Sequence, residues 1–196
     1  MVKIAIDVDG VVADFDRRMW DLAKSRFGTQ MPARFKPPTD WNWKSWKLTE
    51  VQVSELWEEV RGIKDFWLQL KPLPFTIDLR LPQKWAEFVF ITSRVPSGGA
   101  PVGEQTAEWL YRNFGLRWPH VIVASNKGEV CRALHVDVFI DDKPSNCTDV
   151  QENSPGTRVF LCKAPHNANW TPPVGIERVE NFDSFLERIR LENREK

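Results

Sequence analysis

The sequence predicts an α/β fold built on a mostly parallel sheet, with a small helical segment inserted after the first strand. Apolar runs of strand length recur along the chain, and helical patterns lie between most of them. These runs span residues 3–8, 87–92, 121–124, 137–140 and 158–162. Strands that alternate with helices are typical of parallel sheets, because each parallel pair needs a crossover connection. The length of 196 residues fits one domain with a full core and room for a small insertion.

The first predicted strand ends in two acidic residues, in the motif Asp7-Val8-Asp9-Gly10. The residues before the motif are apolar, as in a strand buried inside a sheet, and Gly10 permits a sharp turn. Two neighbouring carboxylates repel each other and cost stability, and a metal cation or a catalytic task would offset that cost. The plainer alternative is a strand followed by a polar Asp-Gly turn.

Two helices are predicted between the first and second strands. Residues 14–27 and 49–61 have apolar side chains at helical spacing. Thr49 and Gln52 fit a capping box at the start of the second helix. The residues between the helices, 29–47, include three prolines and lack periodicity.

The domain organisation follows from this interruption of the strand–helix alternation. We interpret residues 14–70 as a helical cap over one end of the sheet, and residues 1–13 with 71–196 as the α/β core. The alternative is two ordinary packed helices joined by a long loop.

The remaining helices are predicted in the second half of the chain. Residues 104–114 have the pattern of a crossover helix that ends at Gly115. A short helix at 128–134 precedes the fourth strand, and residues 182–190 form the last helix.

Four predicted strands end in polar residues that share one chemistry. In chain order these residues are Asp7 and Asp9, then Thr92, Ser93 and Arg94, then Lys127 after the third strand, and finally Asp141, Asp142 and Lys143. Ligands of parallel α/β sheets bind beyond the carboxyl ends of the strands. Any one of these strand ends could be polar by chance, but four of these types in one chain indicate a site.

Transfer of a phosphoryl group fits this set of residues. A carboxylate can attack phosphorus and form an aspartyl-phosphate. Each pair of like charges at about 4 Å costs on the order of 4 kcal/mol at an effective dielectric near 20, so the reaction needs cations. Magnesium prefers carboxylate oxygens, which Asp7 and the Asp141–Asp142 pair supply, and Lys127 would offset further phosphate charge.

The other strand-end residues have roles in the same reaction. The hydroxyl groups of Thr92 and Ser93 would donate hydrogen bonds to phosphate oxygens. Asp9 is then free to give a proton to the leaving oxygen and to take one from the attacking water.

The four motifs resemble those of the haloacid dehalogenase superfamily of phosphatases, which have a Rossmann-like fold. They match in order as Asp7-Val8-Asp9-Gly10-Val11, Thr92, Lys127 and Asp141-Asp142. The resemblance implies that Asp7 is the nucleophile and Asp9 the acid/base. It also implies a magnesium ion bound by Asp7, by the backbone carbonyl of Asp9 and by an aspartate of the fourth motif. The retained Asp9 indicates phosphatase activity rather than dehalogenation.

A closer resemblance is to the 5′(3′)-deoxyribonucleotidase family, over most of the chain outside residues 28–65. The matching segments are 7–15, Lys71-Pro72-Leu73-Pro74, 90–93, Asn126-Lys127, 139–143 and His166-Asn167. The resemblance implies that Asp142 binds the metal and that Phe15 lines the base pocket. Arg94 departs from the family, since animal members commonly have Pro there, and either a phosphate or an acidic partner is open to it.

A Trp-rich segment lies in the predicted cap. Residues 29–47 carry four basic side chains against one acidic side chain, with Trp41, Trp43 and Trp46 among them. Stacking of a base on an aromatic ring is worth roughly 1–3 kcal/mol, so Trp41 and Trp43 are candidate substrate contacts. The alternative is that these rings close a small core of the cap, just as Phe15 also lies on the apolar face of a helix.

Composition limits the classes of function. The formal net charge is zero, so a global electrostatic footprint for nucleic acid is missing. The three cysteines lack the spacing of a disulfide framework or a zinc site. We expect a cytoplasmic protein without signal peptide or membrane span.

The function we predict is a magnesium-dependent phosphatase of nucleoside monophosphates, preferentially deoxyribonucleotides. Another small phosphomonoester or a nucleic-acid end is the alternative substrate. A nucleic-acid-binding module with a vestigial acidic site is the alternative of another class. The predicted partner is a small-molecule nucleotide, and a homodimer is left open.

Overall fold

A computed structural model describes residues 1–75, 78–80 and 82–194. Its centre is a six-stranded, all-parallel sheet of order β3-β2-β1-β4-β5-β6, which confirms the predicted fold class. The strands are β1 (Val2–Ile6), β2 (Ala86–Thr92), β3 (His120–Val123), β4 (Val138–Asp141), β5 (Arg158–Cys162) and β6 (Ile176–Val179). Positions 76, 77, 81, 195 and 196 of the predicted core range lie outside the described residues.

Six α-helices accompany the sheet in the described part of the chain. They are α1 (Phe15–Phe27), α2 (Glu50–Gly62), α3 (Val102–Phe114), α4 (Lys127–Ala133), α5 (Pro144–Asn153) and α6 (Phe182–Arg194). Five of them lie where the apolar spacing predicted helices. The sequence analysis missed α5, which buries only Cys147 and Val150 and so has little apolar periodicity. It also missed β6, a four-residue edge strand with Glu177 and Arg178 at its centre.

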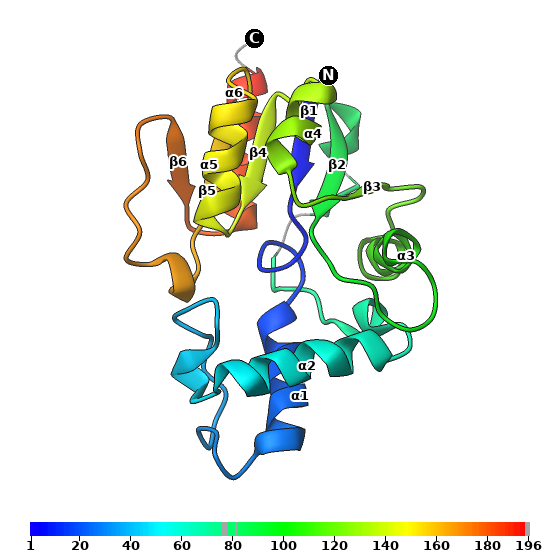
Figure 1. Ribbon diagram of the computed structural model, residues 1–196. Helices are drawn as coiled ribbons and strands as arrows, with labels where there is room; N and C mark the ends of the chain where they lie inside the picture. The colour runs from blue at the N-terminus through cyan, green and yellow to red at the C-terminus, as the bar shows by residue number, and fades with distance from the viewer. Residues whose placement is uncertain (76–77, 81, 195–196) are drawn as a thin grey trace.

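The sheet is covered on both faces. Ile4 and Ile6 of β1 belong to the apolar cluster that contains Phe185 of α6. Ala5, on the opposite side of the same strand, belongs to a second cluster that contains Cys147 of α5. Figure 1 shows α4 and α5 in front of the sheet and α6 behind it. This two-sided burial explains why the strands read as nearly continuous apolar runs.

A tight turn follows β1 and aims the acidic motif away from the sheet. Gly10 has a φ of +82°, and a Cβ atom there would lie 2.0 Å from Asp142 Oδ2. The backbone N–H of Asp7 donates to the carbonyl of Ile140 on β4 at 2.9 Å. The turn therefore holds the first motif against the fourth, and only glycine fits at its tightest point.

The helical segment leaves and rejoins the sheet at adjacent points. Asp14 N donates to Lys71 O at 2.8 Å, and Leu73 N donates to Val12 O at 2.9 Å. Figure 1 shows α1 and α2 beyond the edge at which the strand arrows end. Thr49 and Gln52 form the predicted capping box at the start of α2.

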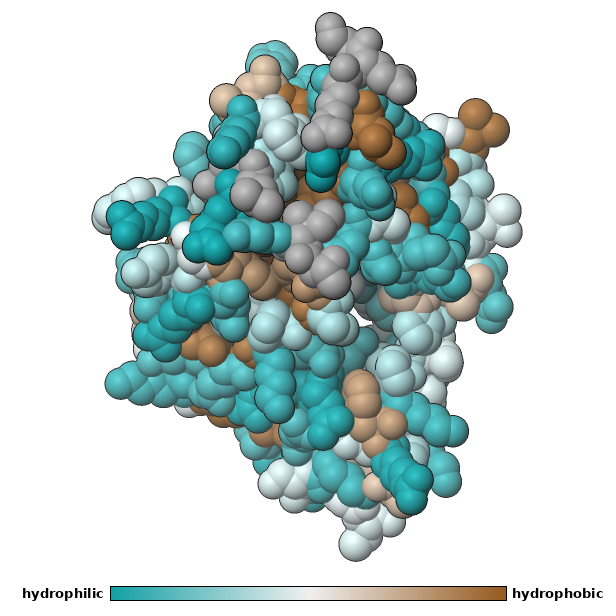
Figure 2. Space-filling model, turned by 180° about the vertical axis from the view of Figure 1, so that it is seen from behind, coloured by the Kyte–Doolittle hydropathy of each residue, from teal (hydrophilic) through white to brown (hydrophobic). Residues whose placement is uncertain are grey.

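The face of the molecule seen from behind is mostly polar. Figure 2, seen from behind, shows mostly hydrophilic side chains with apolar residues in small, separate areas. Among the described residues, none of the helices combines the length and the apolar character that crossing a bilayer requires.

Candidate active site

A cavity of about 390 Å³ lies between the carboxyl edge of the sheet and the helical segment. All ten residues predicted from the sequence as site residues line it: Asp7, Asp9, Phe15, Trp41, Trp43, Thr92, Ser93, Lys127, Asp141 and Asp142. The seven residues at the strand ends come together because β1, β2 and β4 are adjacent and parallel, with β3 beside β2; Phe15, Trp41 and Trp43 come from the segment after β1. A larger hollow of about 730 Å³ lies beside Leu73, but its charged residues Asp78 and Arg80 pair with each other.

Three buried carboxylates form the floor of the cavity. Asp7, Asp141 and Asp142 each offer an oxygen within 4.8 Å of the others. Burial raises the pKa of Asp7 well above its ordinary value, and the neighbouring acidic groups raise it further against the effect of Lys127. Burial, followed by the charge of Asp141, likewise raises the pKa of Asp142. The cluster thus carries more negative charge than its surroundings compensate.

Lys127, the first residue of α4, supplies a buried cation to this cluster. Its ammonium group contacts Asp7 Oδ1 and donates to Asp141 Oδ2 at 2.7 Å. Burial by itself lowers the pKa of Lys127, but the charges of Asp141 and Asp7 outweigh it and raise the pKa above its ordinary value. The ammonium group therefore remains charged at neutral pH.

Backbone and side-chain donors orient the acidic pair at the end of β4. Asp141 accepts from Lys143 N at 2.8 Å and from Asn146 Nδ2 at 2.9 Å. His166 Nε2 lies 3.1 Å from Asp142 Oδ2, although the two are not aligned as a hydrogen bond. Asp141 thus accepts three hydrogen bonds, from Lys127, Lys143 and Asn146, whereas no side-chain hydrogen bond to the Asp142 carboxylate is present among the described residues.

The two hydroxyl residues at the end of β2 differ in their surroundings. Thr92 Oγ1 is buried, lines the cavity and has no hydrogen-bond partner among the described residues. Ser93 is exposed, and its hydroxyl donates to the carbonyl of Ala124 at 2.9 Å. A buried hydroxyl without a partner is costly, so Thr92 is the one prepared for a ligand oxygen.

Asp9 forms an ion pair with Arg94, the arginine for which the sequence allowed either a phosphate or an acidic partner. Arg94 Nε and Nη2 donate to the two carboxylate oxygens of Asp9 at 2.9 and 2.8 Å. Of the two partners considered for Arg94, a phosphate or an acidic residue, this structure contains the acidic one.

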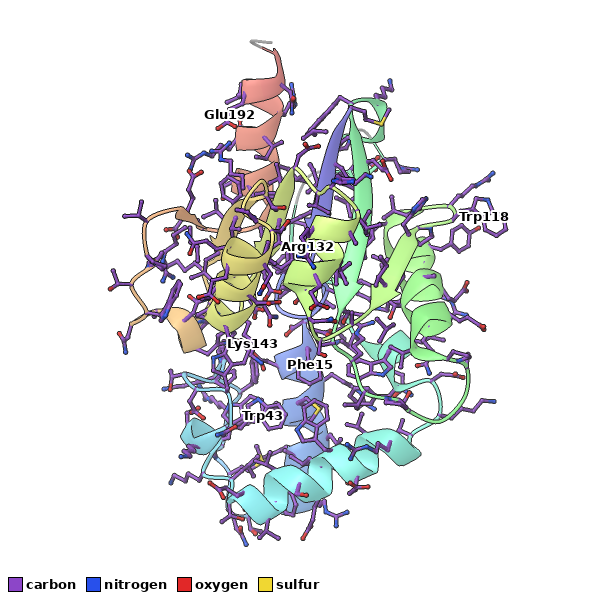
Figure 3. All side chains as sticks on the ribbon, turned by 45° about the horizontal axis from the view of Figure 1, so that its top comes forward. Phe15, Trp43, Trp118, Arg132, Lys143 and Glu192 are labelled. Atoms are coloured by element: carbon purple, nitrogen blue, oxygen red, sulfur yellow. The ribbon has the colours of Figure 1, made fainter. Side chains whose placement is uncertain are left out.

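Aromatic rings form the wall opposite the acidic floor. Phe15 lies 5.8 Å from Trp57 and 5.9 Å from Trp67 between ring centroids, and 6.2 Å from Trp43. Figure 3 shows Phe15 and Trp43 on the side of the cavity formed by the helical segment, with Lys143 on the side of the sheet. Trp41 is 44% exposed, and its ring centroid lies 3.9 Å from that of His166.

Several residues that line the cavity were absent from the sequence prediction. Asp16, Trp57, Trp67 and His166 all do so. Asp16 directly follows Phe15, and burial raises its pKa to about 6, although His166 opposes the shift. Trp57 lies on α2 and Trp67 on a short helical turn at Phe66–Gln69, among apolar residues, so the sequence pattern by itself suggests core positions for both.

The floor of the cavity fits a magnesium ion. Carboxylate oxygens are the hard ligands that Mg²⁺ prefers, and three of them converge here. The raised pKa values of Asp7 and Asp142 reflect burial and mutual repulsion, which a divalent cation would relieve. Asp7 and Asp142 have the free oxygens that would hold it.

Comparison with known families decides the identity. The family model for "5′ nucleotidase, deoxy (pyrimidine), cytosolic type C protein" matches residues 1–194. The chain belongs to this family. It is a phosphomonoester hydrolase of the 5′-nucleotidase type, and its three converging carboxylates fit the magnesium cofactor that the strand-end motifs predicted. No curated protein matches the chain in sequence.

Solved structures show the same fold at low identity. A hydrolase of the haloacid dehalogenase-like family from Streptococcus pneumoniae is 13% identical, with a TM-score of 0.59 over 98% of each chain. The D,D-heptose 1,7-bisphosphate phosphatase of B. bronchiseptica, solved with magnesium and phosphate, is 15% identical. Its TM-score is 0.57 over 98% of this chain and 99% of its own. This 5′-nucleotidase therefore has the fold of these haloacid dehalogenase-like proteins, in line with the resemblance of its four motifs.

Proposed function

We propose that this nucleotidase hydrolyses 5′-monophosphates of deoxyribonucleosides, with Asp7 as nucleophile and Asp9 as acid/base. The observation that carries the proposal is the convergence of Asp7, Lys127 and Asp142 on one buried floor, opposite a wall of aromatic rings. A charged, polar floor suits a phosphate, and an aromatic wall suits a nucleobase. The cavity volume, about 390 Å³, lies within the roughly 300–1,000 Å³ usual for small-molecule sites.

The reaction proceeds in two steps on the residues of this chain. A carboxylate oxygen of Asp7 attacks phosphorus, the bond from phosphorus to the sugar oxygen breaks, and Asp9 gives a proton to that oxygen. Asp9 then takes a proton from water, which attacks the aspartyl-phosphate and releases inorganic phosphate. Magnesium, when bound by Asp7 and Asp142, supplies positive charge to the phosphate oxygens.

Two further residues stabilise the charge that the reaction moves. The Lys127 ammonium already contacts Asp7, so it lies where an incoming phosphate needs a counter-charge. The Thr92 hydroxyl lacks a partner in the described structure and is free to donate to a phosphate oxygen. Ser93 reaches the phosphate only after its hydroxyl leaves Ala124 O.

The helical segment has the role of a cap in this proposal. Residues 14–70 would close over the core formed by 1–13 and 71–196 once the nucleotide has entered. Closure would bring Trp41 and Trp43 against the substrate and exclude bulk water from the first step. The adjacent entry and exit of the segment support this division, since Asp14 and Lys71 are hydrogen-bonded.

A substrate panel tests the proposal. We expect the purified protein with Mg²⁺ to release phosphate from 5′-deoxyribonucleotides with a kcat/KM at least ~10-fold above that for sugar phosphates, because one stacked base is worth roughly 1–3 kcal/mol. The panel includes ribonucleotides, 3′-nucleotides and 5′-phosphorylated oligonucleotides. Preference for a sugar phosphate or an oligonucleotide end would overturn the proposed substrate. Salt-dependent binding of single strands without phosphate release would instead support the binding-module alternative.

The cellular location and the oligomeric state of the enzyme stay predictions. The matching family is described as cytosolic, and we infer a cytoplasmic enzyme that acts on free nucleotides rather than on nucleic acid or at membranes. The homodimer stays a prediction that light scattering of the purified chain tests.

A further inference from the structure

Arg94 makes a contact that the phosphatase motifs alone do not predict. Its side chain is completely buried, whereas that of its partner Asp9 is 22% exposed. The guanidinium group engages both carboxylate oxygens of Asp9 through two different nitrogens, at 2.9 and 2.8 Å. Such a two-pronged contact fixes the plane of the carboxylate as well as its distance.

Two parts of the molecule hold the Arg94 side chain in place, helix α3 and the ring of Trp67. Arg94 Nη1 donates to Thr106 Oγ1 at 2.9 Å, and that hydroxyl donates in turn to the carbonyl of Val102 on α3 at 2.8 Å. On the other side, the guanidinium carbon lies 4.7 Å from the ring centroid of Trp67. Trp67 Nε1 is anchored to Val95 O at 2.9 Å. The position of the Arg94 side chain is therefore fixed by its contacts with Thr106 and Trp67.

We propose that Arg94 is the positioning residue of Asp9 and keeps this carboxylate aimed at the leaving oxygen of the substrate. Asp9 stands in the turn that follows β1, where its side chain would otherwise rotate. A carboxylate has about four lone-pair sites, and the two contacts with Arg94 occupy two of them. Each oxygen keeps a lone pair for the proton that Asp9 transfers. The inference rests on the proposed role of Asp9 as acid/base.

Arg94 uses three of its five N–H donors within the protein, which favours positioning over a role as the main phosphate ligand. Nε, Nη1 and Nη2 each already donate to Asp9 or Thr106. The cation that contacts the proposed nucleophile is Lys127 instead. A misplaced proton donor costs rate in proportion to how much the leaving group needs the proton, and this difference makes the proposal testable.

Two matched substrates isolate the proton-transfer step. One is a 5′-deoxyribonucleotide, whose alkoxide leaving group needs a proton. The other is the same nucleotide with sulfur as the bridging 5′ atom, whose thiolate leaves without one. The rate of nucleoside release in a single turnover with Mg²⁺ is measured for both, together with KM and the binding of inorganic phosphate.

We expect Arg94→Met to slow the oxygen substrate about 10–100-fold and the sulfur substrate less than about 3-fold, because general acid catalysis is worth roughly 10²–10⁴-fold when intact. KM and phosphate affinity stay within about 3-fold, since ground-state binding is untouched. Arg94→Lys should be faster than Arg94→Met but slower than wild type, because lysine keeps the positive charge but lacks the two guanidinium nitrogens that contact both oxygens of Asp9. Arg112→Met, an exposed arginine on α3, is the control and leaves both rates unchanged.

If Arg94→Met folds poorly, the variant Thr106→Val tests the positioning role of Arg94 instead. This variant retains Arg94 and removes only its anchor, so a smaller slowing confined to the oxygen substrate is expected. Equal slowing of both substrates, or weaker phosphate binding with kcat preserved, would overturn the positioning role. A wild-type protein that releases nucleoside from neither substrate would instead overturn the proposed function, which separates the two failures.

Discussion

The acidic floor and the aromatic wall of the active site are held in place by different parts of the fold. The floor consists of Asp7, Lys127, Asp141 and Asp142, which follow strands of one parallel sheet. Its geometry follows from strand order, because adjacent parallel strands end side by side. The wall consists of aromatic rings that packing between a loop and two helices brings together. The sheet thus positions the charged groups that phosphoryl transfer needs, whereas the choice of substrate is the role that we propose for the inserted segment.

The strongest way to test the role of the floor is to remove its nucleophile. We expect Asp7→Asn to lower kcat roughly 10⁴-fold or more, since loss of a catalytic nucleophile has effects of that size. The free energy of unfolding should not fall, because the change removes one charge from a repelling cluster. Phosphate release and urea unfolding check both points, with the exposed Asp21→Asn as control. Near-normal phosphate release would refute the nucleophile assignment.

The buried cation of the floor gives the next largest effect. Lys127→Met should lower the free energy of unfolding without metal by about 3–5 kcal/mol, because it leaves buried carboxylates without their partner. Mg²⁺ at about 100 times its Kd should recover about 2.7 kcal/mol. Urea unfolding with and without Mg²⁺ measures both quantities.

The control for Lys127 is an exposed ion pair. Lys163→Met breaks the pair with Glu180, whose side chains are 52% and 70% exposed, and should cost less than about 1 kcal/mol. Equal losses in the two variants would mean that the floor is not the tightly coupled cluster described here.

Two tryptophans of the segment 29–47, one lining the cavity and one buried behind it, should behave oppositely. Trp46 is 1% exposed and donates from Nε1 to Lys36 O at 2.9 Å, so Trp46→Ala should cost about 3–5 kcal/mol of stability. Trp41 is exposed and lines the cavity, so Trp41→Ala should raise the KM for nucleotides about 10-fold, in line with the loss of one stacked base. Kinetics and thermal unfolding of both variants test this contrast. An unchanged KM for Trp41→Ala would make it a packing residue only.

The smallest expected effect concerns the junction of floor and wall. Burial raises the pKa of Asp16 from 3.8 to about 6, so the folded state binds its proton more tightly than the unfolded state. The free energy of unfolding therefore falls as pH rises from about 4 to 6. Asp16→Asn removes this dependence and should be more stable than wild type by on the order of 2 kcal/mol at pH 7.5, with no gain at pH 4. Urea unfolding at several pH values checks it, and a gain independent of pH would contradict it.

Much of the fold was predictable because its signals are local and repeated. The apolar runs marked five of the strands, and Thr49 with Gln52 marked the start of α2. Local signals failed at α5 and β6, where few side chains are buried and charged residues interrupt the pattern.

For the active site too, local sequence motifs predicted some features, and contacts between distant segments decided the others. The sequence by itself determined the phosphoryl-transfer chemistry, because the motifs from Asp7 to Asp142 must meet once the strands pair in parallel. Only the tertiary structure decided that Arg94 faces Asp9 and that Trp43 lines the cavity while Trp46 is buried behind it. It also decided that Thr92 Oγ1 has no hydrogen-bond partner among the described residues while the Ser93 hydroxyl has one. These outcomes depend on side-chain packing between segments far apart in the chain, and strand or helix periodicity carries no information about such contacts.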